Sequence, residues 1–228
     1  MKVTPVCTDY MLMTAAKNVT RDVSLVFDFI ERPYSPVRFK ELLVSPNEMK
    51  QKFSRLINEE IKNKQAGKPA YILIKINHIT DPVMVKKLYE ASSHGVRIDL
   101  LVRGNCSLIT GVPGVSDTIR INGIIDRYLE HSRIFIFANG GDEKMFIGSA
   151  DWMPRNLDNR VEVIAPVYDP EIKADLKRVV EYGLKDTLQG RVVDGTGENR
   201  PWISEDKTAF RSQEELYKYY LNENRIKD

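Results

Sequence analysis

Cysteine and histidine are both scarce in this chain, which has two cysteines and three histidines among 228 residues. Two cysteines are too few for a disulfide framework or a metal cluster, and they fit a reducing compartment. Long apolar runs are also lacking, so the sequence shows neither a membrane span of about 20 residues nor the apolar core of a signal peptide. We therefore expect a cytoplasmic protein, with peripheral contact to a membrane left open.

A large excess of either charge is lacking too, because 34 basic side chains are balanced by 32 acidic ones and the net charge is +2. This balance argues against a generic nucleic-acid binder, so any attraction for polyanions must come from local clusters of cations. Apolar residues make up 42% of the sequence, which is enough for a real core. The length fits one large domain or two small ones.

A strand–helix–strand pattern begins at residue 70. Residues 70–77 read AYILIKIN, a mostly apolar strand. Asp81 and Pro82 then supply an N-cap and a first helical residue, and Gly95 supplies a helix stop before a second strand at 96–102. This βαβ unit predicts neighbouring parallel strands and a right-handed crossover.

Other helices are indicated by spacing and by caps. Residues 19–30 carry apolar side chains at helical spacing, which predicts a helix. Ser45 with Glu48, and Ser212 with Glu215, have the spacing of capping boxes. We therefore expect one helix to start just after Ser45 and another just after Ser212.

A β-hairpin is predicted in the middle of the chain. Residues 132–137 and 144–148 read SRIFIF and KMFIG, and an Ala-Asn-Gly-Gly-Asp turn separates them. A further strand is expected at 160–167. Asp169 and Pro170 then cap a helix with a regular apolar side.

Polar side chains collect where the predicted parallel strands end. Lys75 and Asn77 end the first strand of the βαβ unit, and Arg103 directly follows the second. In open α/β sheets, ligands bind beyond the carboxyl ends of the strands, so these groups should converge on one edge. Arg103 is suited to grip a phosphate with two N–H groups, although a surface arginine would show the same pattern.

His131 precedes a run of groups that suit phosphate. Arg133 lies two residues on, so in an extended strand both side chains point the same way. Residues 148–151 are mostly small and would let backbone N–H groups approach a ligand. The polar residues that follow are Arg155, Asn156, Asn159, Arg160 and Glu162. A histidine with cationic neighbours and an orienting carboxylate can act as a nucleophile or as a general acid/base in phosphoryl transfer.

The other two histidines, His78 and His94, lack such surroundings. His94 lies before Gly95 at a predicted helix C-terminus, so we interpret it as a partner of the helix dipole and nothing more.

The block around His131 resembles one half of a phospholipase D superfamily site. That superfamily pairs His-x-Lys with a Gly-Ser segment and a downstream Asn and Glu, and it needs two such halves. Here Arg133 stands where Lys is usual and Asp151 where Asn is usual. Both departures point to one branch, because residues 128–163 and 100–120 are similar to the C-terminal part of the first family of bacterial polyphosphate kinases. The segments TDYMLMTA and KPAYILIKINHITDPVMVKKLYEASSHGV fit as well.

The resemblance implies a fold and a domain organisation. The fold class would be α/β, a phospholipase D-like mixed sheet flanked by helices on both faces. Residues 1–41 would be the tail of a preceding catalytic domain plus a linker, and residues 42–228 the C-terminal catalytic domain. The chain would then be a fragment that lacks the domain with the phosphorylated histidine, and the isolated fragment would be inactive.

The resemblance also implies an activity: reversible transfer of the terminal phosphate of ATP to inorganic polyphosphate. The partners would be ATP or ADP, polyphosphate, the missing N-terminal domains of the same enzyme and, in a homo-oligomer, further copies of the chain, but no nucleic acid. Mg²⁺ would be the cofactor of the complete enzyme, with no metal ligands in this fragment. A nucleotide-stacking tyrosine of the family falls at Cys7, so either stacking is lost or Tyr10 or another ring substitutes.

Individual roles follow from that resemblance and from side-chain chemistry. His131 matches the family's second histidine, and we expect a general acid/base there and not the covalent nucleophile. Arg103 matches a nucleotide-contacting arginine, and His131 would also contact nucleotide. Glu162 would orient a partner. The expected polyphosphate contacts are Lys75, Arg133, Ser149, Arg155 and Arg160.

Two rival functions remain open from the sequence. Two copies of the chain could pair about a two-fold axis and bring two His131 side chains together in a phosphodiesterase-like hydrolase. The departures at Arg133 and Asp151 weigh against it. Alternatively, the chain could be a non-catalytic polyphosphate-binding and oligomerisation domain.

Overall fold

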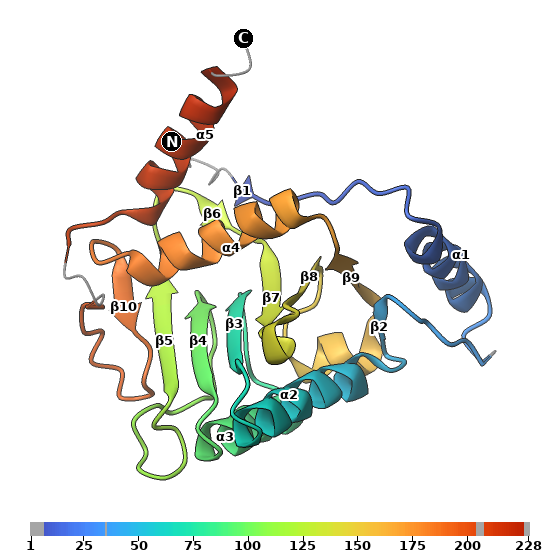
Figure 1. Cartoon of the computed structure of the whole chain (residues 1–228), viewed down its shortest axis with the longest axis horizontal. Helices are drawn as coiled ribbons and strands as arrows, with labels where there is room; N and C mark the ends of the chain where they lie inside the picture. Colours follow the sequence, from blue (N-terminus) through green and yellow to red (C-terminus); the bar gives the residue numbers. More distant parts are fainter. Residues whose placement is uncertain (1–6, 35, 204–207, 226–228) are drawn as a thin grey trace.

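The computed structural model describes residues 7–34, 36–203 and 208–225, and it is built around a mixed β-sheet with helices on both faces (Figure 1). The strands are β1 (Cys7–Thr8), β2 (Leu43–Ser45), β3 (Tyr71–Ile76), β4 (Arg97–Val102), β5 (Ile119–Ile124), β6 (Leu129–Glu130), β7 (Arg133–Phe137), β8 (Lys144–Gly148), β9 (Glu162–Val167) and β10 (Gly190–Val192). The helices are α1 (Lys17–Glu31), α2 (Met49–Gln65), α3 (Pro82–Ser93), α4 (Pro170–Lys185) and α5 (Ser212–Arg225), with short turns η1 (Asn139–Gly141) and η2 (Arg155–Asn159).

The main sheet has eight strands in the order β10-β5-β4-β3-β7-β8-β9-β2, and β1 pairs with β6 in a separate two-stranded sheet. Strands β3, β4 and β5 are parallel, which confirms the βαβ prediction. The predicted hairpin is also present as β7 and β8, and β7 runs antiparallel to β3. The first residues of β7 therefore lie at the same sheet edge as the last residues of β3 and β4.

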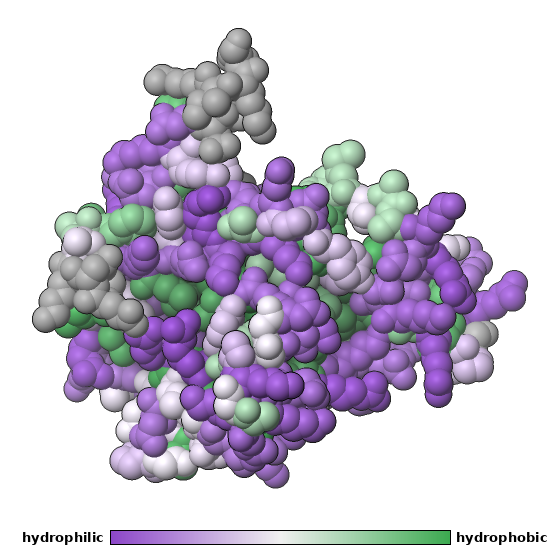
Figure 2. Space-filling view, in the orientation of Figure 1, coloured by the Kyte–Doolittle hydropathy of each residue, from purple (hydrophilic) through white to green (hydrophobic). Residues whose placement is uncertain are grey.

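Helices cover both faces of the sheet, which confirms the predicted α/β class (Figure 1). On one face, α2 and α3 pack against a set of strand residues that includes Ile72 and Ile74. On the other face, α4 packs against the set that includes Leu73 and Leu101. Period-2 alternation in a strand sends neighbouring side chains to opposite faces, and here both sets are apolar because both faces are covered. Among the described helices, none is long and apolar enough to cross a membrane. Hydrophilic side chains cover much of the face drawn in Figure 2.

The capping box predicted at Ser45 is wrong. Ser45 is the last residue of β2, and its buried hydroxyl donates to the carbonyl oxygens of Asn156 at 2.7 Å and of Arg160 at 2.8 Å. Helix α2 begins four residues later, after Glu48, without a side-chain cap. The hydroxyl is used by a segment more than a hundred residues away, which a local pattern does not reveal.

The capping box at Ser212 is wrong for a similar reason. Ser212 is itself the first residue of α5, and both its backbone N–H and its hydroxyl donate to Asp186, at 2.8 and 2.7 Å. The caps predicted at Asp81 and Asp169 are confirmed, since each carboxylate accepts two backbone N–H groups in the first turn of its helix.

The helix predicted at residues 19–30 is confirmed as α1, but its buried side differs from its apolar pattern. Val23, Phe27 and Ile30 are 41, 64 and 54% exposed, whereas Val19 and Phe29 are buried. The apolar spacing therefore identified the helix without identifying the side that packs.

The segment after Asp194 packs back on the domain. Trp202 is 8% exposed and its indole N–H donates to the carbonyl of Leu184 at 2.8 Å. Arg211 then forms a two-bond ion pair with Asp126, at 2.9 and 2.6 Å. Helix α5 is thereby placed next to the segment that leads into His131.

Candidate active site

A cavity of about 670 Å³ opens at the edge of the sheet where β3 and β4 end and β7 begins. We call it the strand-end cavity. Seven of the residues to which the sequence assigned a role in the site line it: Arg103, His131, Arg133, Ser149, Arg155, Arg160 and Glu162. The cavity opens at the sheet edge named by the rule that ligands bind beyond the carboxyl ends of parallel strands.

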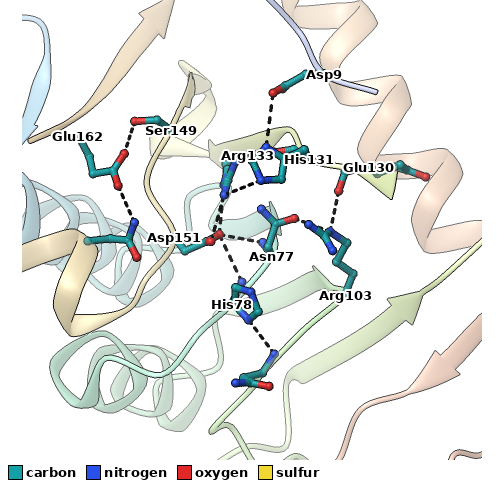
Figure 3. A network of polar contacts seen from close by, with 12 residues as sticks. Asp9, Asn77, His78, Arg103, Glu130, His131, Arg133, Ser149, Asp151 and Glu162 are labelled. Atoms are coloured by element: carbon teal, nitrogen blue, oxygen red, sulfur yellow. Dashed lines mark hydrogen bonds and ion pairs between the residues drawn. The ribbon is translucent and has the colours of Figure 1, made fainter. Parts of the chain in front are cut away.

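A buried ion pair forms the floor of the cavity (Figure 3). Arg133 donates through Nε and Nη2 to the two carboxylate oxygens of Asp151, at 3.2 and 3.1 Å. Both side chains are at most 10% exposed. Asp151 also accepts the backbone N–H groups of Asn77 at 3.0 Å and His78 at 3.3 Å. The Asp151 carboxylate thus ties the end of β3 to the start of β7.

His131 lies above this pair, between an arginine and a carboxylate. Arg133 Nη1 is 3.0 Å from His131 Nδ1, and Asp9 Oδ2 is 3.7 Å from the same nitrogen (Figure 3). Arg133 Nη2 is also 3.4 Å from His131 Nε2, so the guanidinium lies against both ring nitrogens. The side chain is 42% exposed, so the imidazole can reach a ligand in the cavity.

Arg103 is held by one nitrogen and free at the other two. Its Nε donates to Asn77 Oδ1 and to the carbonyl oxygen of Glu130, both at 2.7 Å. Neither terminal nitrogen has a hydrogen bond or ion pair to any described residue. This is the arrangement that a two-point phosphate contact needs.

A second group of polar residues lies across the cavity. Glu162 accepts from the Ser149 hydroxyl at 2.5 Å and from Asn156 Nδ2 at 2.6 Å. Gly148 directly precedes Ser149 in this group. A Cβ at position 148 would be 2.2 Å from the carbonyl oxygen of Val163, so there is no room for a side chain. Its small size therefore serves the close pairing of β8 with β9, whereas the sequence suggested ligand approach.

Two arginines from η2 and its C-terminal side complete this wall. Arg155 and Arg160 line the cavity, both are exposed, and neither guanidinium has a polar partner among the described residues. We call Arg103, His131, Arg133 and Asp151 the His131 wall. We call Ser149, Arg155, Arg160 and Glu162 the η2 wall.

Lys75 does not line the cavity, and Cys7 has no described side chain. Lys75 is 7% exposed, and its ammonium contacts Ser132 Oγ and Glu130 Oε2, each at 3.0 Å. It is not among the described residues that line the strand-end cavity. For Cys7 only the backbone, in β1, is described, so its predicted role at the nucleotide site falls on a side chain outside the described part.

Two residues that line the cavity, Asp9 and His78, were missed. His78 accepts the backbone N–H of Asn105 at its Nδ1, at 2.9 Å. It directly follows the strand at 70–77, so the strand-end rule could have found it. Asp9 comes from a loop segment far away in sequence, and no local pattern points to it. His94 ends α3 with its Nδ1 2.8 Å from the Glu90 carbonyl oxygen, as expected of a partner of the helix end.

Tyr10 also lines the cavity and links it to α5. Its hydroxyl is 3.2 Å from the hydroxyl of Tyr220, and burial raises the pKa of Tyr10 to about 12. Among the described residues, no group of three or more His, Cys, Asp and Glu side chains is placed to hold a metal ion.

Comparisons with known proteins agree with this geometry. Residues 42–213 match the family model described as polyphosphate kinase C-terminal domain 2. The polyphosphate kinase of Escherichia coli K12 is 44% identical over 212 residues, and that of Vibrio parahaemolyticus is 42% identical over 221 residues. The crystal structure of polyphosphate kinase from Porphyromonas gingivalis matches with a TM-score of 0.88 and 39% identity, over 94% of this chain and 33% of that one. The alignments cover 93% and 97% of this chain but only 31% and 32% of the two curated relatives.

Proposed function

The chain belongs to the polyphosphate kinase family, and from this premise we propose that the strand-end cavity is one half of a site that transfers phosphoryl groups between ATP and inorganic polyphosphate. The chain spans about a third of the length of its curated relatives. The other half, including the histidine that is phosphorylated, would come from a domain that this chain does not contain. The same incompleteness is why we expect the chain alone to bind its substrates without turning them over.

The convergence of His131, Arg103 and two unpaired arginines on one cavity carries this proposal. Phosphoryl transfer needs accurate positioning and stabilisation of spreading negative charge more than it needs covalent chemistry from the protein. The free terminal nitrogens of Arg103 would bind nucleotide phosphates. Arg155 and Arg160 would bind successive phosphates of the chain, with Arg133 and Ser149 nearer to His131.

The proposed reaction has two steps. A ring nitrogen of the histidine in the other domain attacks the γ-phosphorus, the bond to the β–γ bridging oxygen breaks, and the electron pair leaves on ADP. A terminal oxygen of polyphosphate then attacks the same phosphorus, and the P–N electron pair returns to the imidazole. His131 would donate a ring N–H proton to the departing oxygen and take one back in the reverse direction, while Asp9 would stabilise the charged ring.

Lys75 has a supporting part in this proposal. Its buried ammonium bridges Ser132 and Glu130, the two neighbours of His131 in the chain. It would hold the histidine in place and contribute to polyphosphate binding only through that placement. Tyr10, which lines the cavity, is the ring we propose for contact with the nucleotide base in place of the family tyrosine at Cys7.

Magnesium would enter with the nucleotide. The described residues provide no ready-made cluster of acidic and histidine ligands, and Mg²⁺ commonly binds through substrate phosphates with few protein ligands. We therefore propose Mg-ATP as the form bound here and derive no step from a metal ligand of this chain. ADP would be bound in the reverse reaction, and a homo-oligomer stays a prediction.

The first test is to mix the chain with Mg-ATP labelled at the γ-phosphate and look for acid-labile label on the protein. We expect no label, together with Mg-ATP binding that weakens in Arg103→Ala and His131→Ala but not in His94→Gln, the matched control at an exposed histidine. Label that disappears in His131→Ala would overturn the proposal and make His131 the nucleophile. A dimer that cleaves a phosphodiester would favour the self-paired hydrolase instead.

A further inference from the structure

The segment that carries His131 is poorly supported by the main sheet. Within the described residues, strand β6, at Leu129–Glu130, pairs with the two residues of β1, and the His131 N–H extends this pairing by donating to the Thr8 carbonyl oxygen at 2.9 Å. Yet this segment presents His131 to the cavity, and the Glu130 carbonyl oxygen is one of two acceptors that hold Arg103. Two-residue strand pairs are weak by themselves, so another contact must fix the position of the segment.

Gln213, on the first turn of α5, makes that contact. Its Oε1 accepts the Tyr128 backbone N–H at 2.9 Å, and its Nε2 donates to the Tyr128 carbonyl oxygen at 3.0 Å. The same Nε2 donates to Glu130 Oε1 at 2.9 Å. The amide therefore binds both polar groups of one residue, as a neighbouring strand would, and Gln213 is 8% exposed.

The contact continues through Glu130 to the other side of His131. The second carboxylate oxygen of Glu130 lies 3.0 Å from Lys75 Nζ, and Lys75 donates to the Ser132 hydroxyl at 3.0 Å. Glu130 and Ser132 are the two chain neighbours of His131. A displacement at Gln213 would thus reach both ends of the residue that bears the imidazole.

Hydrogen bonds of the two preceding residues fix the position of Gln213. Ser212 donates twice to Asp186, and Arg211 donates twice to Asp126, a residue of the segment in question. The Arg211 guanidinium also holds the pKa of Asp126 below its ordinary value. These bonds fix the start of α5 from both sides, so the Gln213 amide has a fixed place from which to hold the segment.

We propose that Gln213 is a positioning residue of the phosphotransfer site, one that acts through Tyr128 and Glu130 to place His131 and Arg103. This inference rests on the proposed function for the identity of the ligand, but not for the geometry. Displacements of about 1 Å in positioning groups can change rates up to about 100-fold. For the loss of Gln213 we expect a smaller effect, a decrease of about ten-fold in the affinity for Mg-ATP.

The test compares Gln213→Met, which keeps the size and removes all three hydrogen bonds, with Lys218→Gln. Lys218 is exposed on the same helix and pairs with Glu215 alone among the residues that the structure describes, so it serves as the matched control. The chain has three histidines, which allows the imidazole nitrogen signals to be assigned by NMR with His131→Ala. In Gln213→Met we expect the His131 signals to shift while those of His94 stay, and Mg-ATP affinity to fall about ten-fold. Lys218→Gln should change neither.

A purely structural role predicts another result. If Gln213→Met lowers the melting temperature but leaves the His131 signals and Mg-ATP affinity at wild-type values in the folded protein, the proposal is overturned. Should Gln213→Met fail to fold, Gln213→Glu keeps the acceptor for the Tyr128 N–H and loses the donor, and it should shift the His131 signals in the same way. Wild-type protein that binds neither ATP nor polyphosphate would defeat the proposed function, while the His131 signals would still decide the role of Gln213.

Discussion

The two walls of the strand-end cavity hold their cations differently. On the His131 wall, Arg133 is buried and paired with Asp151, and Arg103 is fixed through its Nε. On the η2 wall, Arg155 and Arg160 are exposed and have no polar partner among the described residues. Fixed groups suit the atoms that react, because their geometry must not vary. Free guanidinium groups suit a repetitive polyanion, whose successive phosphates present the same contact many times.

Asp151→Ala should have the largest effect, and that effect is on the free energy of unfolding. Asp151→Ala leaves the Arg133 guanidinium buried without its counter-ion, and such a loss typically costs about 3–5 kcal/mol of the free energy of unfolding. It also releases the backbone N–H groups of Asn77 and His78. Chemical denaturation of the wild type and the variant measures the effect.

The matched control is Asp158→Ala on the η2 side, where the carboxylate is 49% exposed and pairs with Lys50. It should change the free energy of unfolding by no more than about 1 kcal/mol. Equal effects of the two substitutions would mean that the His131 wall is not the more rigidly built of the two.

Arg103→Ala should have the next largest effect, and on binding more than on folding. Loss of a charge-assisted contact to a phosphate is expected to cost about 1.5–3 kcal/mol, which is a drop of roughly 10–100-fold in Mg-ATP affinity. Calorimetric titration measures this affinity. Arg97→Ala, at the other end of β4, is the control, because Arg97 pairs with Asp99 away from the cavity. An unchanged Mg-ATP affinity in Arg103→Ala would remove Arg103 from the nucleotide site.

Substitutions on the η2 wall should be milder and sensitive to salt. Arg155→Ala and Arg160→Ala are each expected to cost about 0.5–1 kcal/mol of polyphosphate affinity at low ionic strength, with an unchanged melting temperature. The loss should shrink at about 1 M salt, where exposed charges are screened beyond roughly 3 Å. Lys144→Ala, at the opposite end of β8, should leave polyphosphate affinity unchanged. A loss of stability in either arginine variant would show that these residues are structural.

Tyr10→Phe should have the smallest effect, and its effect on stability should be measurable only at alkaline pH. Burial raises the pKa of Tyr10 to about 12 from an ordinary value of 10.0. A pKa raised on folding contributes stability that is fully present below pH 10 and is lost as the pH rises towards 12. Tyr10→Phe should remove this part of the alkaline loss, as measured by unfolding between pH 9 and pH 12. Identical alkaline profiles for the two proteins would contradict a buried, neutral Tyr10.

Sequence patterns predicted the helices, strands and caps that are specified by residues close together in the chain. The βαβ unit, the β7–β8 hairpin and the caps at Asp81 and Asp169 all depend on residues that are close in the chain. The edge of the sheet that carries the site follows from the same patterns, since parallel strands end together. His131, Arg103, Arg133 and the η2 arginines could be found in this way.

The rest of the site depends on contacts between distant segments. Lys75 looked like a phosphate ligand, because the sequence does not show that Glu130 and Ser132 occupy its ammonium. Asp9 comes from outside the main sheet, and Ser45 serves η2 instead of capping α2. In each case a side chain satisfies a partner many residues away, and burial decides which of its possible partners it takes.

The link between Tyr10 and Tyr220 has a consequence for synthesis on the ribosome. Their hydroxyl groups are 3.2 Å apart although 210 residues separate them in the chain. Contacts between such distant segments are costly to close and tend to form late. The edge of the cavity at Tyr10 therefore gains its final contact only after Tyr220 has been translated, and intermediates without α5 leave Tyr10 without this partner.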